Sequence, residues 1–148
     1  MIIPLQTLKS ILPQSYPFIL IDQITAFEKD QTLTAIKNIT HNEWIFENLS
    51  DGYLPQFPET LMIESAAQAS WVLYYLSRVN NFQHVPKFIL GKIQAEFSGG
   101  VFFSDQLEIK VLATKMWDKS GMVDAYLSVD KRPIGSVNFF YSVYAPQL

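Results

Sequence analysis

Residues 58–80 read PETLMIESAAQASWVLYYLSRVN, a long and largely apolar segment near the middle of the chain. Pro58 at the start of a helix loses no intrahelical hydrogen bond, and Glu59 in the first turn suits the positive end of the helix dipole. The body of the segment is apolar or small on almost every side, whereas a surface helix shows one polar face. We therefore predict a helix from residue 59 to about residue 80 that is buried on most sides.

Patterns typical of strands lie on both sides of this helix, and a short helix over residues 8–12, stopped by Pro13, precedes them. The expected strands are residues 18–21 (as a strand start), 31–40, 87–97, 105–114, 121–130 and 134–144. The last two are joined by a tight connection at residues 131–133, which predicts a hairpin. The pattern indicates one α+β domain over residues 1–148, with an antiparallel sheet of five or six strands around the helix. The segment from residue 41 to 57 is a loop long enough to suggest a functional role.

Composition narrows the class of function. The 148 residues carry a formal net charge of −3 without a basic stripe, which argues against nucleic acid as a partner. The absence of cysteine excludes disulfides, thiol nucleophiles and thiolate metal sites. His41 and His84 lack metal-ligand spacing, so we expect neither a metal nor a cofactor.

The longest uncharged stretch, residues 65–77, is too short to span a bilayer, and the N-terminus lacks signal-peptide features. We expect a cytoplasmic protein with no membrane partner.

Glu64 is a carboxylate set into the apolar body of the predicted helix. An ionised carboxylate in an apolar site is costly, so such a group is paired, protonated or placed where a substrate needs it. Alternatively, Glu64 lies on a solvated edge of the helix. Gln68 lies one turn later on the same face and is placed to hydrogen-bond with it. The nearby aromatic residues either line an acyl-sized tunnel or belong to the core: Phe57, Trp71, Phe97, Phe102 and Phe103.

Four segments carry a family resemblance that covers most of the chain in one order. They are residues 11–22 (ILPQSYPFILID), residues 37–43 (KNITHNE), Phe57-Pro58 with residues 61–68 (LMIESAAQ), and Phe97 with Val101 and residues 105–107. In these segments the chain resembles the (3R)-hydroxyacyl-acyl-carrier-protein dehydratases of fatty acid synthesis. The resemblance implies a hot-dog fold, a dimer with its active site at the subunit interface, and a thioester substrate on an acyl carrier protein or coenzyme A.

The resemblance also assigns roles to residues. In that family a His in a Gly-His-Phe-Pro loop removes the α-proton of the substrate, and a Glu on the partner's central helix assists departure of the β-hydroxyl. By motif match, Glu64 takes the position of the acid and Gln68 that of the helix Gln. The resemblance further predicts substrate contacts from residues around the helix start and the later strand pair, namely Phe57, Pro58, Glu59, Gln68, Phe97 and Val101.

Three departures from the family pattern concern function. Counted back from Glu64 without a gap, the place of the His falls on Ser50; the preferred alignment matches residues 52–55 to Gly-His-Phe-Pro and places Tyr53 there. A phenol with its ordinary pKa near 10 is a poor base at neutral pH. Glu59 stands where the family has a Gly whose N–H polarises the thioester carbonyl. Residues 98–100, SGG, replace a basic stretch, which weakens the case for docking an acidic carrier protein.

Three interpretations remain open. The first, which we prefer, is a divergent dehydratase-like hydro-lyase of fatty acid, polyene or polyketide-type synthesis, in which Glu64 is the acid/base and Tyr53 or His41 assists. The second is a non-catalytic subunit that partners an active paralogue, because a hot-dog subunit that lacks the His can still supply Glu64. The third is an acyl thioesterase, in which a carboxylate activates water; only fold-level analogy favours it. The assembly is accordingly expected to be a homodimer, a heterodimer with a related hot-dog subunit, or a higher oligomer.

Overall fold

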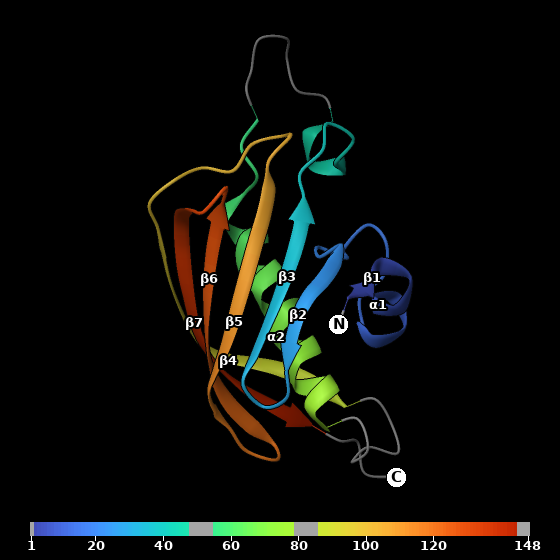
Figure 1. Cartoon of the computed structure of the whole chain (residues 1–148), viewed down its shortest axis with the longest axis vertical. Coiled ribbons are helices and arrows are strands. Elements are labelled where there is room, and N and C mark those ends of the chain that lie inside the picture. The colour runs from blue at the N-terminus through green and yellow to red at the C-terminus, as the bar shows by residue number, and fades with distance from the viewer. Residues whose placement is uncertain (1, 48–54, 79–85, 145–148) are drawn as a thin grey trace.

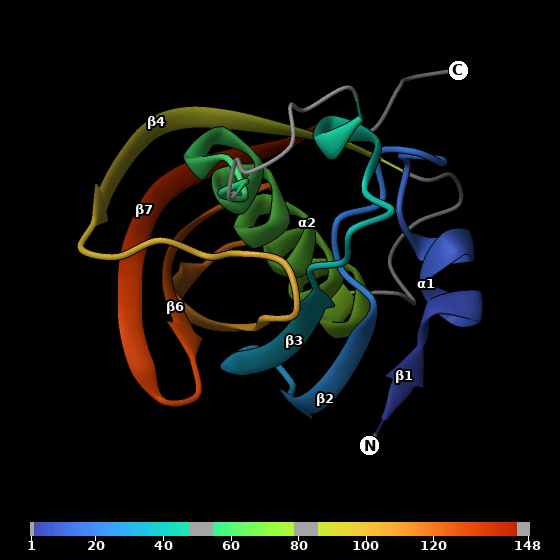
Figure 2. The same cartoon turned by 90° about the horizontal axis from the view of Figure 1, so that it is seen from above.

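The computed structural model describes residues 2–47, 55–78 and 86–144. One antiparallel sheet curls around a central helix, α2 (Glu59–Arg78), as Figures 1 and 2 show from two directions. The strands are β1 (Ile3–Pro4), β2 (Gln23–Glu28), β3 (Thr32–Asn38), β4 (Lys87–Phe97), β5 (Gln106–Met116), β6 (Ser120–Val129) and β7 (Arg132–Tyr144). Their order in the sheet is β1-β2-β3-β5-β6-β7-β4. The predicted hot-dog arrangement is confirmed, with seven strands in place of the expected five or six.

The additional strand is β1, whose two residues pair with the start of β2. A segment this short has no alternation that a sequence pattern could reveal. It leads directly into a short helix, α1 (Leu5–Ile11), so Figure 1 shows β1 and α1 beside β2. The expected short helix is therefore present but begins three residues earlier than predicted.

Helix α2 is buried as its sequence predicts: 12 of its 20 residues are buried. Small side chains at many of these positions let the concave sheet approach the helix backbone closely. The hydroxyls of Ser65 and Ser70 donate to the carbonyl oxygens of Leu61 and Ala66, at 2.8 and 2.7 Å. These bonds satisfy polar atoms that would otherwise be buried without a partner.

The predicted hairpin joins β6 and β7. Asp130 and Lys131 at its turn have φ values of 49° and 65°, the left-handed conformation that a two-residue hairpin turn requires at both positions. Along β6 the alternate residues Val123, Ala125, Leu127 and Val129 are buried, as the sequence pattern predicts. The opposite face of the strand is therefore the outer surface of the sheet.

The predicted strand start at residues 18–21 is not found, because β2 begins at Gln23. The backbone of this segment is bonded to the helix in place of a neighbouring strand. The side-chain amide of Gln68 accepts a hydrogen bond from the N–H of Leu20 and donates one to the carbonyl oxygen of Phe18, each at 2.8 Å. The first bond to β3 comes from the N–H of Asp22, which donates to Ile36. The strand therefore begins five residues later than predicted, and Gln68 on α2 binds the backbone of the residues before it.

An aromatic cluster closes the C-terminal end of the core. Phe88 and Tyr141 stack with ring centroids 4.6 Å apart, and Trp71 meets Phe88 edge-on at 5.5 Å. The indole N–H of Trp71 donates to the carbonyl oxygen of Ile11 at 3.0 Å, which ties α1 to α2. Trp71 is therefore a core residue. Across residues 2–47, 55–78 and 86–144, no helix is long and apolar enough to cross a membrane.

Candidate active site around Glu64

Glu64 lies on a half-buried face of α2 and is held by two amides. Its Oε1 accepts a hydrogen bond from Nε2 of Gln68 at 3.0 Å and another from Nε2 of Gln14 at 3.3 Å. The predicted contact between Glu64 and Gln68 is therefore present. The carboxylate is neither deeply buried without a partner nor free in bulk water, which is a suitable setting for a group that exchanges a proton with a ligand.

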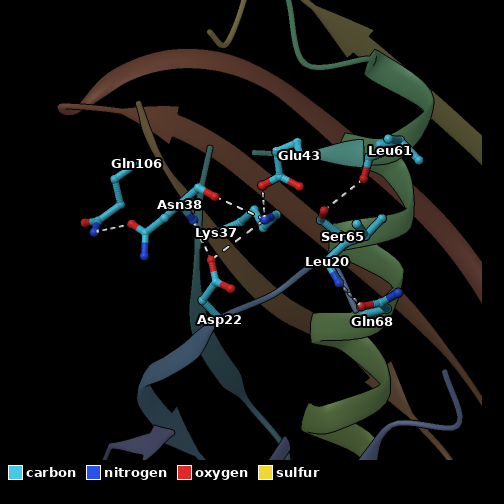
Figure 3. A network of polar contacts seen from close by, with 9 residues as sticks. All are labelled: Leu20, Asp22, Lys37, Asn38, Glu43, Leu61, Ser65, Gln68 and Gln106. Carbon is cyan, nitrogen blue, oxygen red and sulfur yellow. Dashed lines mark hydrogen bonds and ion pairs between the residues drawn. The ribbon is translucent and has the colours of Figure 1, made fainter. Parts of the chain in front are cut away.

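The orientation of the Gln68 amide is determined by its neighbours. Its oxygen accepts the N–H of Leu20, while its nitrogen donates to both Phe18 and Glu64. Turning this amide over would place donor against donor and acceptor against acceptor. Gln68 is buried, and Figure 3 shows its side chain directed at Leu20. It therefore joins the N-terminal segment to the helix and presents a fixed donor to Glu64.

The N-terminal end of α2 is anchored to the segment that follows β4. Phe57 is fully buried, and its N–H donates to the carbonyl oxygen of Val101 at 2.7 Å. Pro58 is exposed, and its carbonyl oxygen accepts the N–H groups of Leu61 and Met62. Glu59 is also exposed, and no described residue accepts its N–H. That group is free to bind a ligand oxygen, as the first N–H groups of a helix often are.

Phe97 is the last residue of β4, and Val101 lies within the segment that connects β4 to β5. Phe97 is half-buried and pairs with Gly135, where a methyl group would lie 2.7 Å from the ring of Phe97 and 2.5 Å from the carbonyl oxygen of Glu96. Only glycine allows this close approach. Val101 is fully buried. Of the residues predicted to contact substrate, Phe57 and Val101 are thus buried in the core.

A basic side chain lies against residues 98–100, which carry none of their own. A methyl group at Gly99 would lie 3.0 Å from Nη1 of Arg132, the first residue of β7. The N–H groups of Ser98 and Gly99 both donate to Ile134, which holds this segment beside the start of β7. The basic stretch of the family is absent from residues 98–100, but Arg132, from a distant part of the chain, places a basic group beside them.

Of the two candidates for the missing base, Tyr53 and His41, the structure describes only His41. Tyr53 and the alternative position, Ser50, lie outside the described residues. His41 is exposed and packs against Phe103 with ring centroids 3.8 Å apart. None of the hydrogen bonds in the described part of the chain joins His41 to Glu64. The structure thus offers no contact through which His41 assists Glu64.

Lys37 forms a buried ion pair that the sequence analysis did not find. Its Nζ lies 2.6 Å from Oε1 of Glu43 and 3.9 Å from Oδ2 of Asp22, and it also donates to the carbonyl oxygen of Asn38. Figure 3 shows this network between the end of β3 and the segment that follows. Lys37 is only 6% exposed. The signal was available, because Lys37 falls on the inward-facing positions of β3 together with Leu33 and Ala35, which are apolar.

This network holds the start of the long segment between β3 and α2. Glu43 directly precedes a single 3₁₀ turn, η1 (Trp44–Phe46), so the pair ties that turn to the end of β3. Within the three described ranges, no group of three or more His, Asp or Glu side chains is arranged to hold a metal ion.

Comparison with known proteins identifies the family. A model of the FabA-like domain matches residues 12–138. The chain belongs to the FabA-like domain family. A relative named 3-hydroxyacyl-acyl-carrier-protein dehydratase FabZ, from Neisseria meningitidis serogroup C (strain 053442), is 39% identical over 110 residues, covering 73% of each chain. A relative of the same name from Vibrio atlanticus (strain LGP32) is 37% identical over 107 residues, covering 70% of this chain and 69% of the relative.

Solved structures with the same fold include a dehydratase complex and thioesterases. A chain of the dehydratase heterocomplex ApeI:P from Xenorhabdus doucetiae superposes with a TM-score of 0.78 at 16% identity, covering 95% of this chain and 91% of that one. A mutant of the thioesterase PA1618 from Pseudomonas aeruginosa gives a TM-score of 0.67 at 18% identity, with 96% and 94% covered. At these identities the likeness establishes the fold and leaves the chemistry to the site.

Proposed function

We propose that this chain is a dehydratase-like hydro-lyase that acts on 3-hydroxyacyl thioesters, with Glu64 as its acid. In the proposed reaction the Cα–H and Cβ–O bonds break, a Cα–Cβ double bond forms, and the hydroxyl leaves as water with a proton from Glu64. The observation that carries the proposal is the Glu64 carboxylate, set on the central helix with one oxygen held by two amides. Family membership and the names of the relatives support the same substrate class.

The proposed reaction also needs a base for the α-proton. In a homodimer, Tyr53 is the candidate by its place in the sequence. In a heterodimer, a His-bearing subunit of the same family supplies the base, and this chain supplies Glu64. The second arrangement is favoured by the absence of His from residues 44–58 and by the similarity to a chain of a dehydratase heterocomplex.

The edge strand β4 supports a dimer of either kind. It is 11 residues long, ends the sheet order, and exposes Ile89 and Ile93 at 50% and 43%. Ile93 pairs with Phe139, which is buried. Paired residues lie on the same face of a sheet, so Ile93 lies on the face that is turned toward α2. A long edge with exposed apolar side chains is usually covered in the assembled protein. We therefore propose that a second hot-dog subunit pairs along β4.

Hydration of a crotonyl thioester by the purified chain tests the proposed function. We expect loss of the enoyl absorbance with the wild-type chain, either alone or after addition of a His-bearing family member from the same organism. Glu64→Gln is expected to reduce the rate by about 10² to 10⁴-fold, the range for loss of a general acid. Glu108→Gln, which changes an exposed carboxylate on β5, is the matched control.

The same assay separates the alternatives. Activity only in the mixture, abolished by Glu64→Gln in this chain, identifies the heterodimer with a shared site. Activity in the mixture that is indifferent to Glu64→Gln identifies a non-catalytic partner and contradicts the role of Glu64. Release of free thiol without hydration, followed with a thiol reagent, identifies a thioesterase and contradicts the dehydratase proposal.

A further inference from the structure

Gln14 reaches the candidate acid from a part of the chain 50 residues away. It lies in the connection after α1, and its Nε2 donates to Oε1 of Glu64 at 3.3 Å. The connection is held close to α2, because the indole of Trp71 donates to Ile11 at the end of α1. Gln14 is thus delivered to the site by the packing of α1 on α2, and no local sequence pattern places it there.

Both amides bind the same oxygen of the carboxylate. Gln68 donates to Oε1 of Glu64 from one side and Gln14 donates to it from another, while no hydrogen bond from a described residue reaches Oε2. Two N–H donors on one oxygen favour negative charge or carbonyl character on that oxygen. When the group is protonated, the proton is therefore placed on the other oxygen, Oε2.

The amide of Gln14 is oriented by Glu64 alone among the described residues. Its own Oε1 is buried and has no hydrogen-bond partner there. A buried polar atom without a partner is unfavourable, so the arrangement is not what packing by itself would select. Turning the amide over would place its oxygen against the carboxylate. The contact with Glu64 is therefore the interaction that determines how Gln14 sits.

We propose that Gln14 is a positioning residue that, together with Gln68, holds Oε1 of Glu64 and presents Oε2 as the oxygen that transfers the proton. This inference rests on the proposed role of Glu64 as the acid. Gln68 holds the carboxylate along the helix, and Gln14 restrains its rotation about the last side-chain bond. Loss of Gln14 is then expected to slow the chemical step and to leave binding of the thioester nearly unchanged.

Gln14→Met tests the inference because it keeps the length of the side chain and removes both polar atoms. We expect kcat to fall about tenfold and KM to stay within about twofold, since small errors in placing a catalytic group reduce the rate of the chemical step. Gln6→Met is the matched control, an exposed glutamine on α1 of the same N-terminal segment. If Gln14→Met does not fold, Gln14→Asn replaces it, because the shorter amide cannot reach Glu64.

A second measurement does not depend on turnover. In ¹⁵N-labelled protein, Glu64→Ala is expected to shift the side-chain amide signals of both Gln14 and Gln68 and to leave that of Gln6 unchanged. If the side-chain amide signals of Gln14 do not shift in Glu64→Ala, the inference is overturned, even if the enzyme is active. If the wild-type chain shows no activity in any mixture, the proposed function fails, while the amide signals still report whether Gln14 holds the carboxylate. A rise in KM at constant kcat would make Gln14 a binding residue and would also overturn the inference.

Discussion

The side-chain amide of Gln68 donates a hydrogen bond to Oε1 of Glu64 over 3.0 Å, and the two residues lie one turn apart on the same face of α2. The same amide bonds the backbone of residues 18 and 20. One side chain thus connects the candidate acid to the N-terminal segment. This dual role predicts that substitution of Gln68 lowers both the activity and the stability of the protein.

Gln68→Leu is expected to destabilise the fold and to reduce activity. The change leaves the buried N–H of Leu20 and the part-buried carbonyl oxygen of Phe18 without their partner, and a buried group left unpaired costs about 1–3 kcal/mol. We expect the free energy of unfolding, measured in urea, to fall by about 2–4 kcal/mol. Gln106→Leu removes an exposed amide that donates to Asn38, and its effect is expected to stay within about 0.5 kcal/mol. Equal effects of the two changes would contradict the structural role of Gln68.

Lys37→Met is expected to destabilise the protein by about 3 kcal/mol, near the lower end of the range for breaking a buried ion pair. The change leaves the Glu43 carboxylate, whose side chain is 13% exposed, without its cation. The double variant Lys37→Met/Glu43→Gln is expected to lose less than the single variant, because the uncompensated charge is gone. Urea unfolding of the four members of this cycle measures the coupling. A double variant that loses the sum of the two single effects would show that the pair is not coupled.

Arg132→Glu is expected to raise KM for a thioester on an acyl carrier protein, and to leave KM for the coenzyme A thioester within about twofold. The guanidinium of Arg132 lies against Gly99, where the family has a basic stretch, and reversal of its charge would repel an acidic carrier. We expect an increase of about 3- to 10-fold, typical of a charge at the rim of an interface. The control is Lys110→Glu, which reverses the charge of an exposed residue on β5. Parallel increases for both substrates would assign Arg132 to the thioester itself.

Tyr141→Phe is expected to make the protein less sensitive to alkaline pH. Burial, and to a smaller extent Tyr74, raises the pKa of Tyr141 above its ordinary value of 10.0. The folded protein therefore keeps a proton that the unfolded chain releases, so this contribution to stability is complete below about pH 10 and falls as the pH rises further. No described residue hydrogen-bonds the Tyr141 hydroxyl, so its removal is expected to change stability at pH 7 by less than about 1 kcal/mol.

Urea unfolding of wild type and Tyr141→Phe between pH 7 and pH 11 checks this prediction. The alkaline loss is expected to be smaller in the variant and not to disappear, because burial also raises the pKa of Tyr74. Identical slopes for the two proteins would contradict it.

Much of the fold is determined by the sequence alone, because it depends on local periodicity. The start of α2 at Glu59, the bounds of β4 and the β6–β7 hairpin follow from capping, alternation and turn residues within short windows. The pairing of Glu64 with Gln68 follows from the same logic, since residues four apart on a helix are neighbours. Family membership then rests on motifs that are themselves contiguous.

The surroundings of Glu64 and the long-range contacts of residues 18–21 and 98–100 were decided by tertiary structure. Gln14 hydrogen-bonds Glu64 across 50 residues of sequence, and Arg132 lies against Gly99 from another strand. The N–H of Leu20, in the segment predicted as a strand, donates to Gln68 on α2 and not to another strand. No local pattern contains these contacts, because they arise only when the sheet closes around the helix and brings distant side chains together. The sequence by itself thus placed one carboxylate on a buried helix. Packing of the N-terminal segment determined which of its two oxygens is held.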